Sequence, residues 1–318
     1  MGTAFATLSI PKANSPLRET RHQRLPLRRA FLFCDDNAVA ENFLDATLVL
    51  VGHGSTLNAE SSAPVHQHAD ELRRRAVFGQ VLEGFWKLEP CLAGVLRGAF
   101  GRRVFIVPLF ISEGYFTEEV VPRELGFARS NETYERVQCR GEQTIHYCGP
   151  VGTHHSMTKV LLDRAQEVVA KHPFPRPVPA GETALFVAGH GTGNNENSRK
   201  AIERQAELIR GLKTYADVHP VFMEEQPRIE DCYTMTPARN IVVVPFFISD
   251  GLHSYEDIPV MLGEARSAVQ DRLKQGQPTW RNPTEKRGKR VWYAASVGSD
   301  PFVADVILER VREAATEG

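Results

Sequence analysis

The chain has 318 residues and a formal net charge of −1 at pH 7, a length that suits two ordinary domains. The near-neutral charge gives no reason to expect a nucleic-acid or membrane partner, and no apolar run approaches the roughly eighteen residues that span a bilayer. The five cysteines form no C-x-x-C pair, which argues against a disulfide framework or a cysteine-ligated metal. We therefore expect a soluble protein of the cytoplasm.

Residues 1–44 are predicted to form an N-terminal extension. Residues 1–34 carry six Lys/Arg against one Glu, and the apolar stretch 30–34 is followed at once by Asp35 and Asp36. That stretch is too short for the core of a signal peptide, so a flexible or loosely docked segment is the preferred interpretation. A transit peptide is the alternative.

The next segment is an internal repeat, whose two copies are separated by a constant offset of 137 residues. Residues 48–55 read LVLVGHGS and recur at 185–192 as LFVAGHGT, and residues 107–114 read VPLFISEG and recur at 244–251 as VPFFISDG. A register kept over about sixty residues indicates two structurally equivalent domains. We assign them to 45–171 and 182–318, joined by a Pro-rich linker at 172–181.

Each copy begins with an apolar run that reads as a buried strand and stops at Gly-His-Gly. A helix follows, predicted at about 197–212 in the second copy, and further apolar strands are predicted at 104–111 and 241–248. A third match, at offset 146, pairs 145–147 with 291–293 and closes each copy with a strand and a helix. Strands this apolar are typical of parallel sheets covered on both faces. The sequence therefore predicts an α/β protein with two tandem, doubly wound, flavodoxin-like domains.

Polar residues in the second copy follow the predicted strands. His190 and His253 both come after strand ends, and Glu224 or Glu225 joins them from the end of the intervening strand. In an open α/β sheet, ligands bind beyond the carboxyl ends of the strands. Two imidazoles and a carboxylate at that edge can hold a divalent transition metal or move protons beside one. The sequence does not decide which of the two glutamates points inward.

The first copy keeps His53 but not the other members of this set. At offset 137, Phe116 stands where His253 stands and Lys87 where Glu224 stands. Phenylalanine cannot bind a metal, and lysine has the wrong charge for binding a cation. The second half is therefore expected to carry the chemistry. The first is expected to form the opposite wall of the substrate cleft, with His53 a secondary contact or a structural hydrogen bond.

The order of motifs resembles the class II tetrapyrrole chelatases of the sirohydrochlorin cobalto/ferrochelatase type, in a two-copy form. The matching segments of the second copy are HGT at 190–192, FME…P at 222–227, VPFFISDGLH…DIP at 244–259 and VGSDP at 297–301. The resemblance implies an enzyme that inserts Co²⁺ or Fe²⁺, with Ni²⁺ as a further candidate, into sirohydrochlorin for cobalamin or siroheme biosynthesis, without an organic cofactor. It also implies that His190 and His253 bind the metal and that Glu224 is the acid/base. A non-catalytic tetrapyrrole- or metal-binding protein is the alternative.

Such a macrocycle is large, flat and rich in carboxylates, so its cleft needs apolar walls and cationic donors at the rim. Arg199 and Lys200 are candidates for these donors, although the pair also reads as a solvated helix face. Because one chain contains both halves, a monomer is sufficient to build one cleft.

Two other signals carry less weight. A nucleotide-binding loop at 189–194 is disfavoured, because the third glycine of G-x-G-x-x-G would fall at Asn194. Four histidines have no counterpart in the second copy and are expected at the surface, with metal storage as a minor alternative: His66, His68, His154 and His155.

Overall fold

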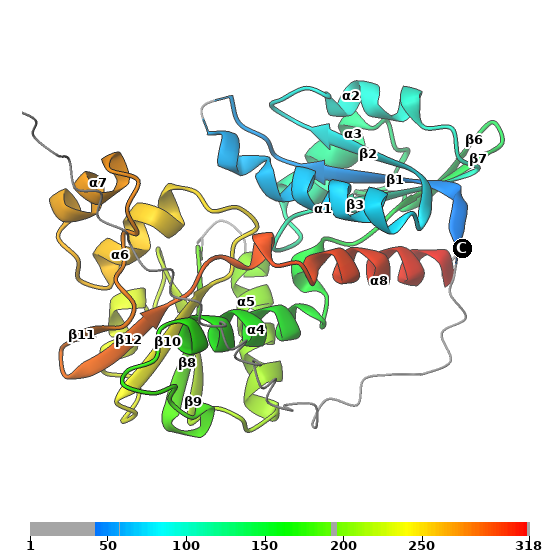
Figure 1. The fold of residues 1–318 in the computed structure, drawn as a ribbon. Helices are drawn as coiled ribbons and strands as arrows, with labels where there is room; N and C mark the ends of the chain where they lie inside the picture. The colour runs from blue at the N-terminus through cyan, green and yellow to red at the C-terminus, as the bar shows by residue number, and fades with distance from the viewer. Residues whose placement is uncertain (1–41, 57, 192–195, 317–318) are drawn as a thin grey trace, which may run out of the picture. The chain divides into compact units, whose positions relative to one another are not determined.

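Two sheets of the same topology carry the two copies of the repeat in the computed structural model (Figure 1). The structure describes residues 42–56, 58–191 and 196–316. The strand order is β2-β1-β3-β7-β6 in the first sheet and β9-β8-β10-β12-β11 in the second. Four strands of each sheet are parallel, and the edge strand is antiparallel. The predicted pair of doubly wound α/β domains is thereby confirmed, whereas the extension predicted at 1–44 lies outside the described residues as far as residue 41.

The first half alternates buried parallel strands with helices. Its principal elements are β1 (Phe43–Gly52), α1 (Ala63–Arg75), β2 (Phe78–Phe85), α2 (Leu92–Val95), β3 (Arg103–Pro108), η3 (Phe116–Val120), α3 (Val121–Glu124), β4 (Arg129–Ser130), β5 (Thr133–Tyr134), β6 (Val137–Arg140), β7 (Gln143–Tyr147), η4 (Val151–Thr153) and α4 (Met157–Lys171). Short 3₁₀ turns η1 (Ala59–Ser61) and η2 (Leu96–Gly98) complete it.

The second half repeats this order with one replacement. Its elements are η5 (Ala180–Glu182), β8 (Thr183–Gly189), α5 (Glu196–Gly211), β9 (Asp217–Phe222), η6 (Ile229–Tyr233), β10 (Asn240–Pro245), η7 (His253–Asp257), α6 (Ile258–Met261), α7 (Arg266–Lys274), β11 (Thr284–Lys286), β12 (Lys289–Tyr293), η8 (Val297–Ser299) and α8 (Val303–Thr316). Helix α7 stands where the first half has the small β4–β5 sheet. Strands β3 and β10 end at their prolines, three residues before the predicted ends, because proline has no N–H for the sheet ladder.

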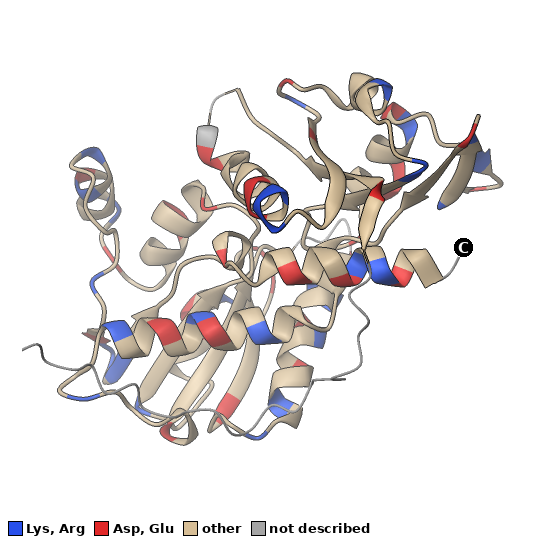
Figure 2. Cartoon of the chain, turned by 45° about the vertical axis from the view of Figure 1, so that its right-hand side comes forward, with Lys and Arg blue, Asp and Glu red and all other residues tan. Residues whose placement is uncertain are grey.

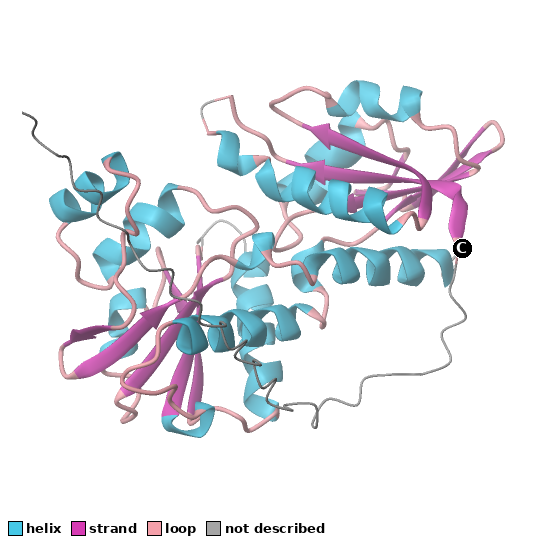
Figure 3. Ribbon diagram, in the orientation of Figure 1, coloured by secondary structure: helices cyan, strands magenta, loops and turns pink. Residues whose placement is uncertain are grey.

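The last helix of each half packs on the sheet of the other half (Figures 1 and 3). Helix α4 contacts β10 and β12, and helix α8 contacts β3 and β7. One hydrophobic core consequently contains residues from both halves, including Phe105 and Val107 of the first sheet and Leu185 and Val187 of the second. Each sheet has a separate core on its other face. Residues 42–318 thus cluster as one compact unit.

Because the last helices are exchanged, the turn before each of them, η4 or η8, lies against a helix of the other half. His68 on α1 donates from Nε2 to the carbonyl oxygen of Gly298 at 2.6 Å. Its counterpart on α5, Gln205, donates to the carbonyl oxygens of Gly152 and His154 at 3.4 and 2.9 Å. Side chains are excluded at both glycines, since a Cβ at Gly152 or Gly298 would lie 2.1 or 1.6 Å from a backbone oxygen.

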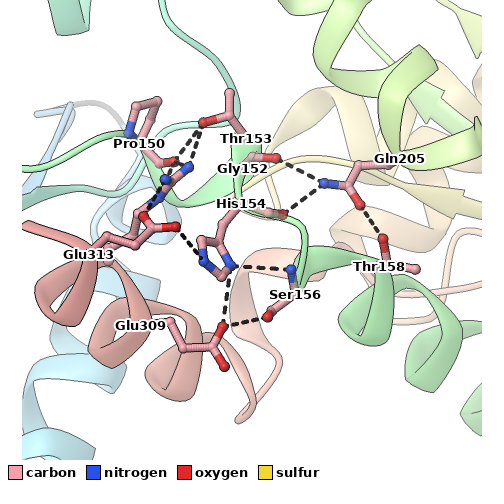
Figure 4. A network of polar contacts seen from close by, with 10 residues as sticks. Pro150, Gly152, Thr153, His154, Ser156, Thr158, Gln205, Glu309 and Glu313 are labelled. Atoms are coloured by element: carbon pink, nitrogen blue, oxygen red, sulfur yellow. Dashed lines mark hydrogen bonds and ion pairs between the residues drawn. The ribbon is translucent and has the colours of Figure 1, made fainter. Parts of the chain in front are cut away.

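His154 lies between η4 and α4, beside α8 (Figure 4). Its ring nitrogens lie 3.3 Å from Glu309 and 3.1 Å from Glu313, and the backbone N–H of Ser156 donates to Nδ1 at 3.2 Å. Burial is the main cause that lowers the pKa of His154 below its ordinary value.

The expectation that four histidines lie at the surface is half wrong. His66 and His155 are exposed, but His68 and His154 are buried. Both buried histidines lie where the halves meet, so the helix exchange is the reason that they leave the surface.

Charged residues of both signs are interspersed along the helices, whereas the strands are mostly uncharged (Figure 2). This distribution agrees with the near-zero net charge. Among the described residues, no helix has the length and apolar character needed to cross a membrane.

The internal repeat supplies a test of the His68 contact. Burial lowers the pKa of His68 from its ordinary value of 6.5, so the unfolded chain takes up a proton at this site more readily than the folded one. The stability contribution is then complete above about pH 6.5 and is lost as the pH falls below it. We expect His68→Gln, which copies Gln205, to change the free energy of unfolding by less than about 1 kcal/mol at pH 7.5 and to weaken its pH dependence.

Urea unfolding at pH 7.5 and 5.5 measures this difference. Burial also lowers the pKa values of three other histidines, His146, His154 and His219. Their contribution to the pH dependence of the free energy of unfolding is the same in both proteins. An unchanged pH dependence in His68→Gln would contradict the prediction.

Candidate metal centre

His190 lies directly after β8, at the carboxyl edge of the second sheet. Gly189 before it allows α5 to approach closely, since a Cβ there would lie 1.9 Å from Cδ1 of Ile202. The His190 carbonyl oxygen accepts from the backbone N–H groups of Met223 and Glu224, both at 3.1 Å. The histidine and the turn after β9 are therefore tied together through the backbone.

The Nδ1 atom of His190 lies 2.8 Å from the carbonyl oxygen of Gly191. A carbonyl oxygen only accepts, so this contact requires the proton on Nδ1 and leaves the lone pair on Nε2. A hydrogen bond of this kind on the second nitrogen is what orients a metal-binding histidine.

His253 is the first residue of η7, a π-helical turn. Its Nδ1 lies 2.9 Å from Oδ2 of Asp257, so the ring again presents Nε2. The preceding loop is fixed by Ser296, whose backbone N–H donates to Asp250 at 3.2 Å and whose hydroxyl bonds that of Ser254 at 2.8 Å. Single π-turns are frequent at functional sites.

The structure brings the two histidines together. Their ring centroids lie 5.1 Å apart with an interplanar angle of 80°, and both side chains are partly exposed. Within the described ranges, no group of three or more His, Cys, Asp or Glu side chains is arranged to hold a metal. The arrangement is that of two imidazole rings partly open to solvent, which suits an ion that is held weakly and then released.

The two adjacent glutamates point to different partners. Glu224 is exposed, and its Oε2 lies 3.7 Å from Nδ1 of His190. Glu225 forms an ion pair with Nη1 of Arg199 at 2.9 Å, and the same guanidinium lies 4.9 Å from the ring centroid of Phe222. Of the two glutamates, Glu224 is therefore the one beside His190, and Arg199 holds Glu225.

Lys200 is directed elsewhere. Its Nζ lies 2.8 Å from Oε2 of Glu196, one turn earlier on α5, and both side chains are well exposed. This is the geometry of a solvated helix face, and the structure does not bring Lys200 to the histidine pair.

The equivalent edge of the first half carries an aromatic cluster, which we define as His53, Trp86, Phe110 and Phe116. The His53 ring lies 5.4 Å from Trp86 and 4.7 Å from Phe116, and Trp86 lies 4.8 Å from Phe116, all measured between centroids. His53 keeps the hydrogen bond of its counterpart, from Nδ1 to the carbonyl oxygen of Gly54 at 2.7 Å. The π-turn is also kept, as η3.

Two residues of these edges have no role in the sequence-based prediction. Asp257 lies four residues after His253, a spacing that brings side chains together on a helical turn and was the available signal. Trp86 matches Met223 at the repeat offset, and that pairing alone gives no indication of function.

The CbiX family profile matches the chain twice, at residues 47–168 and 184–314. A probable sirohydrochlorin cobaltochelatase of Halobacterium salinarum is 44% identical over 280 residues, which are 84% of this chain and 91% of the relative.

Solved structures agree with the fold. A multi-domain protein of Deinococcus radiodurans, described as structurally similar to chelatases and as having two additional novel domains, matches with a TM-score of 0.66 and 29% identity. The match covers 83% of this chain and 54% of that protein, so the chain spans about half of its length. SirB from Bacillus subtilis, solved with Fe³⁺, matches with a TM-score of 0.60 and 18% identity over 86% of this chain and 96% of its own. The repeated topology, the double profile match and the archaeal relative together show that this chain belongs to the CbiX family, with two copies of the family unit.

Proposed function

We propose that the protein is a sirohydrochlorin chelatase that inserts Co²⁺ or Fe²⁺ into its tetrapyrrole substrate. The relative from Halobacterium carries the name of that activity. The observation that carries the proposal is the pair formed by His190 and His253, each with Nδ1 bonded to an oxygen and Nε2 left to bind a metal.

Metal insertion exchanges one divalent cation for two pyrrole N–H protons. The ion must leave its protein ligands during the reaction, so neutral and incomplete coordination is an advantage, and two imidazoles provide it. As the pyrrole nitrogens bind the metal, the protons need an acceptor at the same edge of the sheet. Glu224, beside His190 and open to solvent, is suited to accept them and pass them to water.

Several parts of the proposal rest on the sequence. These parts are the two repeat units, the linker between them, a monomer that contains a complete cleft, and a cytoplasmic location. The units are residues 45–171 and 182–318, and the linker is 172–181. The free thiols Cys91, Cys139, Cys148 and Cys232 support a reducing compartment. Ni²⁺ is a further candidate metal, because histidine ligands accept several divalent ions.

Replacing His253 by alanine tests the function. We expect at least a hundredfold loss in the rate of Co²⁺ or Fe²⁺ insertion, because one of two metal ligands is removed, while the metal-free macrocycle still binds. The absorbance change of sirohydrochlorin with each metal in turn measures the rate. His66→Ala, at an exposed histidine of the first half, is the matched control and should retain the wild-type rate.

Two results would exclude the proposal. If the wild-type protein bound the macrocycle but inserted none of Co²⁺, Fe²⁺ or Ni²⁺, the non-catalytic alternative would replace the enzyme. If His253→Ala kept the wild-type rate, this pair would not be the metal centre.

The neighbouring glutamates form a second matched pair of variants. Glu224→Gln is expected to lower kcat by about a hundredfold, the range of general acid–base catalysis, with little effect on Co²⁺ binding. Glu225→Gln should lower kcat only a few-fold, because its partner is Arg199. Steady-state kinetics with Co²⁺ distinguish them, and a larger loss in Glu225→Gln would transfer the acid/base role to Glu225.

Asp257 is expected to act through His253. Asp257→Ala should weaken Co²⁺ binding by about ten- to a hundredfold, as measured for partners of metal-binding histidines. Asp257→Asn should restore much of the affinity, because its amide oxygen can still accept from Nδ1. Isothermal titration with Co²⁺ alone measures both, and equal losses in the two variants would show that the carboxylate does more than orient the ring.

A further inference from the structure

The aromatic cluster of the first half occupies the positions at which the second half has its metal centre. Phe116 opens η3 as His253 opens η7, and Trp86 follows β2 as Met223 follows β9. The Trp86 and Phe116 rings meet edge to face at 79°, and Phe116 stacks on Phe110 with 5.7 Å between centroids. A phenylalanine ring thus stands in place of His253, packed among the rings of Trp86 and Phe110.

Trp86 is exposed although it is held in this cluster. Its relative exposure is 37%, against 4% for Trp280 and 0% for Trp292, the other two tryptophans. A partly exposed tryptophan that is packed by neighbouring rings is typical of a surface that binds a ligand, because an aromatic contact costs little side-chain entropy there.

A cation lies over the indole ring itself. The Nζ atom of Lys87 is 4.5 Å from the ring centroid of Trp86, and within the part of the chain that the structure describes Lys87 forms no ion pair with a carboxylate. At the equivalent position the second half has Glu224. The two edges thus present opposite charges at corresponding positions, a cation here and a candidate proton acceptor there.

We propose that the aromatic cluster and Lys87 form a binding platform for the tetrapyrrole macrocycle. The proposal rests on the chelatase function and deepens it. A flat conjugated ring with carboxylates at its rim matches both parts: the exposed Lys87 side chain moves from the Trp86 ring to pair with a peripheral carboxylate, and the macrocycle stacks on the indole that it uncovers.

Contacts between loops support a platform that faces the metal centre. Asn58 of the first half follows β1, and its Nδ2 would lie 3.6 Å from a Cβ at Gly251, six residues after β10. Loops from the carboxyl ends of both sheets therefore meet, one sheet carrying the platform and the other the histidine pair.

This arrangement divides binding from chemistry. The first half holds the macrocycle, and the second supplies the metal and accepts the protons. Trp86 and Lys87 should therefore determine affinity for the macrocycle and leave the insertion step to His190 and His253.

Binding of metal-free sirohydrochlorin by equilibrium dialysis, together with the kinetics of Co²⁺ insertion, tests the platform. Trp86→Ala is expected to raise Kd and KM for the macrocycle about tenfold, the scale of one aromatic stacking contact, with kcat within about twofold of wild type. Trp86→Phe should recover most of the affinity. Lys87→Glu should weaken binding several-fold, and added salt should narrow that difference because it screens exposed charges.

Phe100→Ala is the matched control. Phe100 is 70% exposed and precedes β3, at the opposite end of the same sheet, so its removal should leave Kd and KM unchanged. Should Trp86→Ala fail to fold, Lys87→Glu, which changes only an exposed side chain, decides the question.

The outcomes separate the two proposals. If the wild type inserts metal but Trp86→Ala and Lys87→Glu keep wild-type Kd and KM, the platform is wrong and the chelatase stands. A loss of kcat at unchanged KM would also overturn it, because Trp86 would then act in the chemistry. If the wild type neither binds sirohydrochlorin nor inserts metal, the chelatase itself is wrong, and this is known before any variant is compared.

Discussion

The exchange of α4 and α8 between the sheets is the packing interaction on which the rest of the structure depends. Each sheet covers its inner face with one helix of its own half and one helix of the other. The apolar residues of α8 that this arrangement buries are Val303, Ala304, Val306, Ile307, Leu308 and Val311, and each large side chain among them contributes about 1.5–3 kcal/mol when fully buried. Neither sheet can keep water from its inner face without a helix of the other half, so the two halves form one core.

The same helix exchange affects the loops around the candidate metal centre. The turn η8 leads into α8, and its Gly298 donates to the carbonyl oxygen of Phe247 at 3.0 Å while accepting from His68 of the first half. Just before η8, Ser296 fixes the loop that carries His253. The contact between the halves at Gly298 thus lies two residues from Ser296, which bonds the loop that carries His253. The first half, which has phenylalanine in place of His253, thereby bonds through His68 the turn that follows Ser296.

The sequence was sufficient for the topology and for the pair of histidines. Buried parallel strands are continuous apolar runs, the repeat doubles every signal, and the topology alone places His190 and His253 at one edge of a sheet. It was insufficient for the helix exchange, because an amphipathic pattern shows that a helix has an apolar face but not which sheet it covers. The burial of His68 and His154 follows from that exchange and was missed with it. The difference between Glu224 and Glu225 depends on Arg199, which only the folded chain brings beside Glu225.

The helix exchange also bears on how such a chain can evolve. Two identical subunits that exchanged their last helices would be related by symmetry, and any substitution at one edge would appear at the other. In one chain with two copies, the inner face of each sheet still needs a helix from the other half. A substitution at the carboxyl edge of one sheet, however, leaves the other edge unchanged. Lys87 opposite Glu224 and Phe116 opposite His253 are changes that symmetry would forbid. A single chain with two copies can therefore keep the shared core while only one of its two equivalent edges changes.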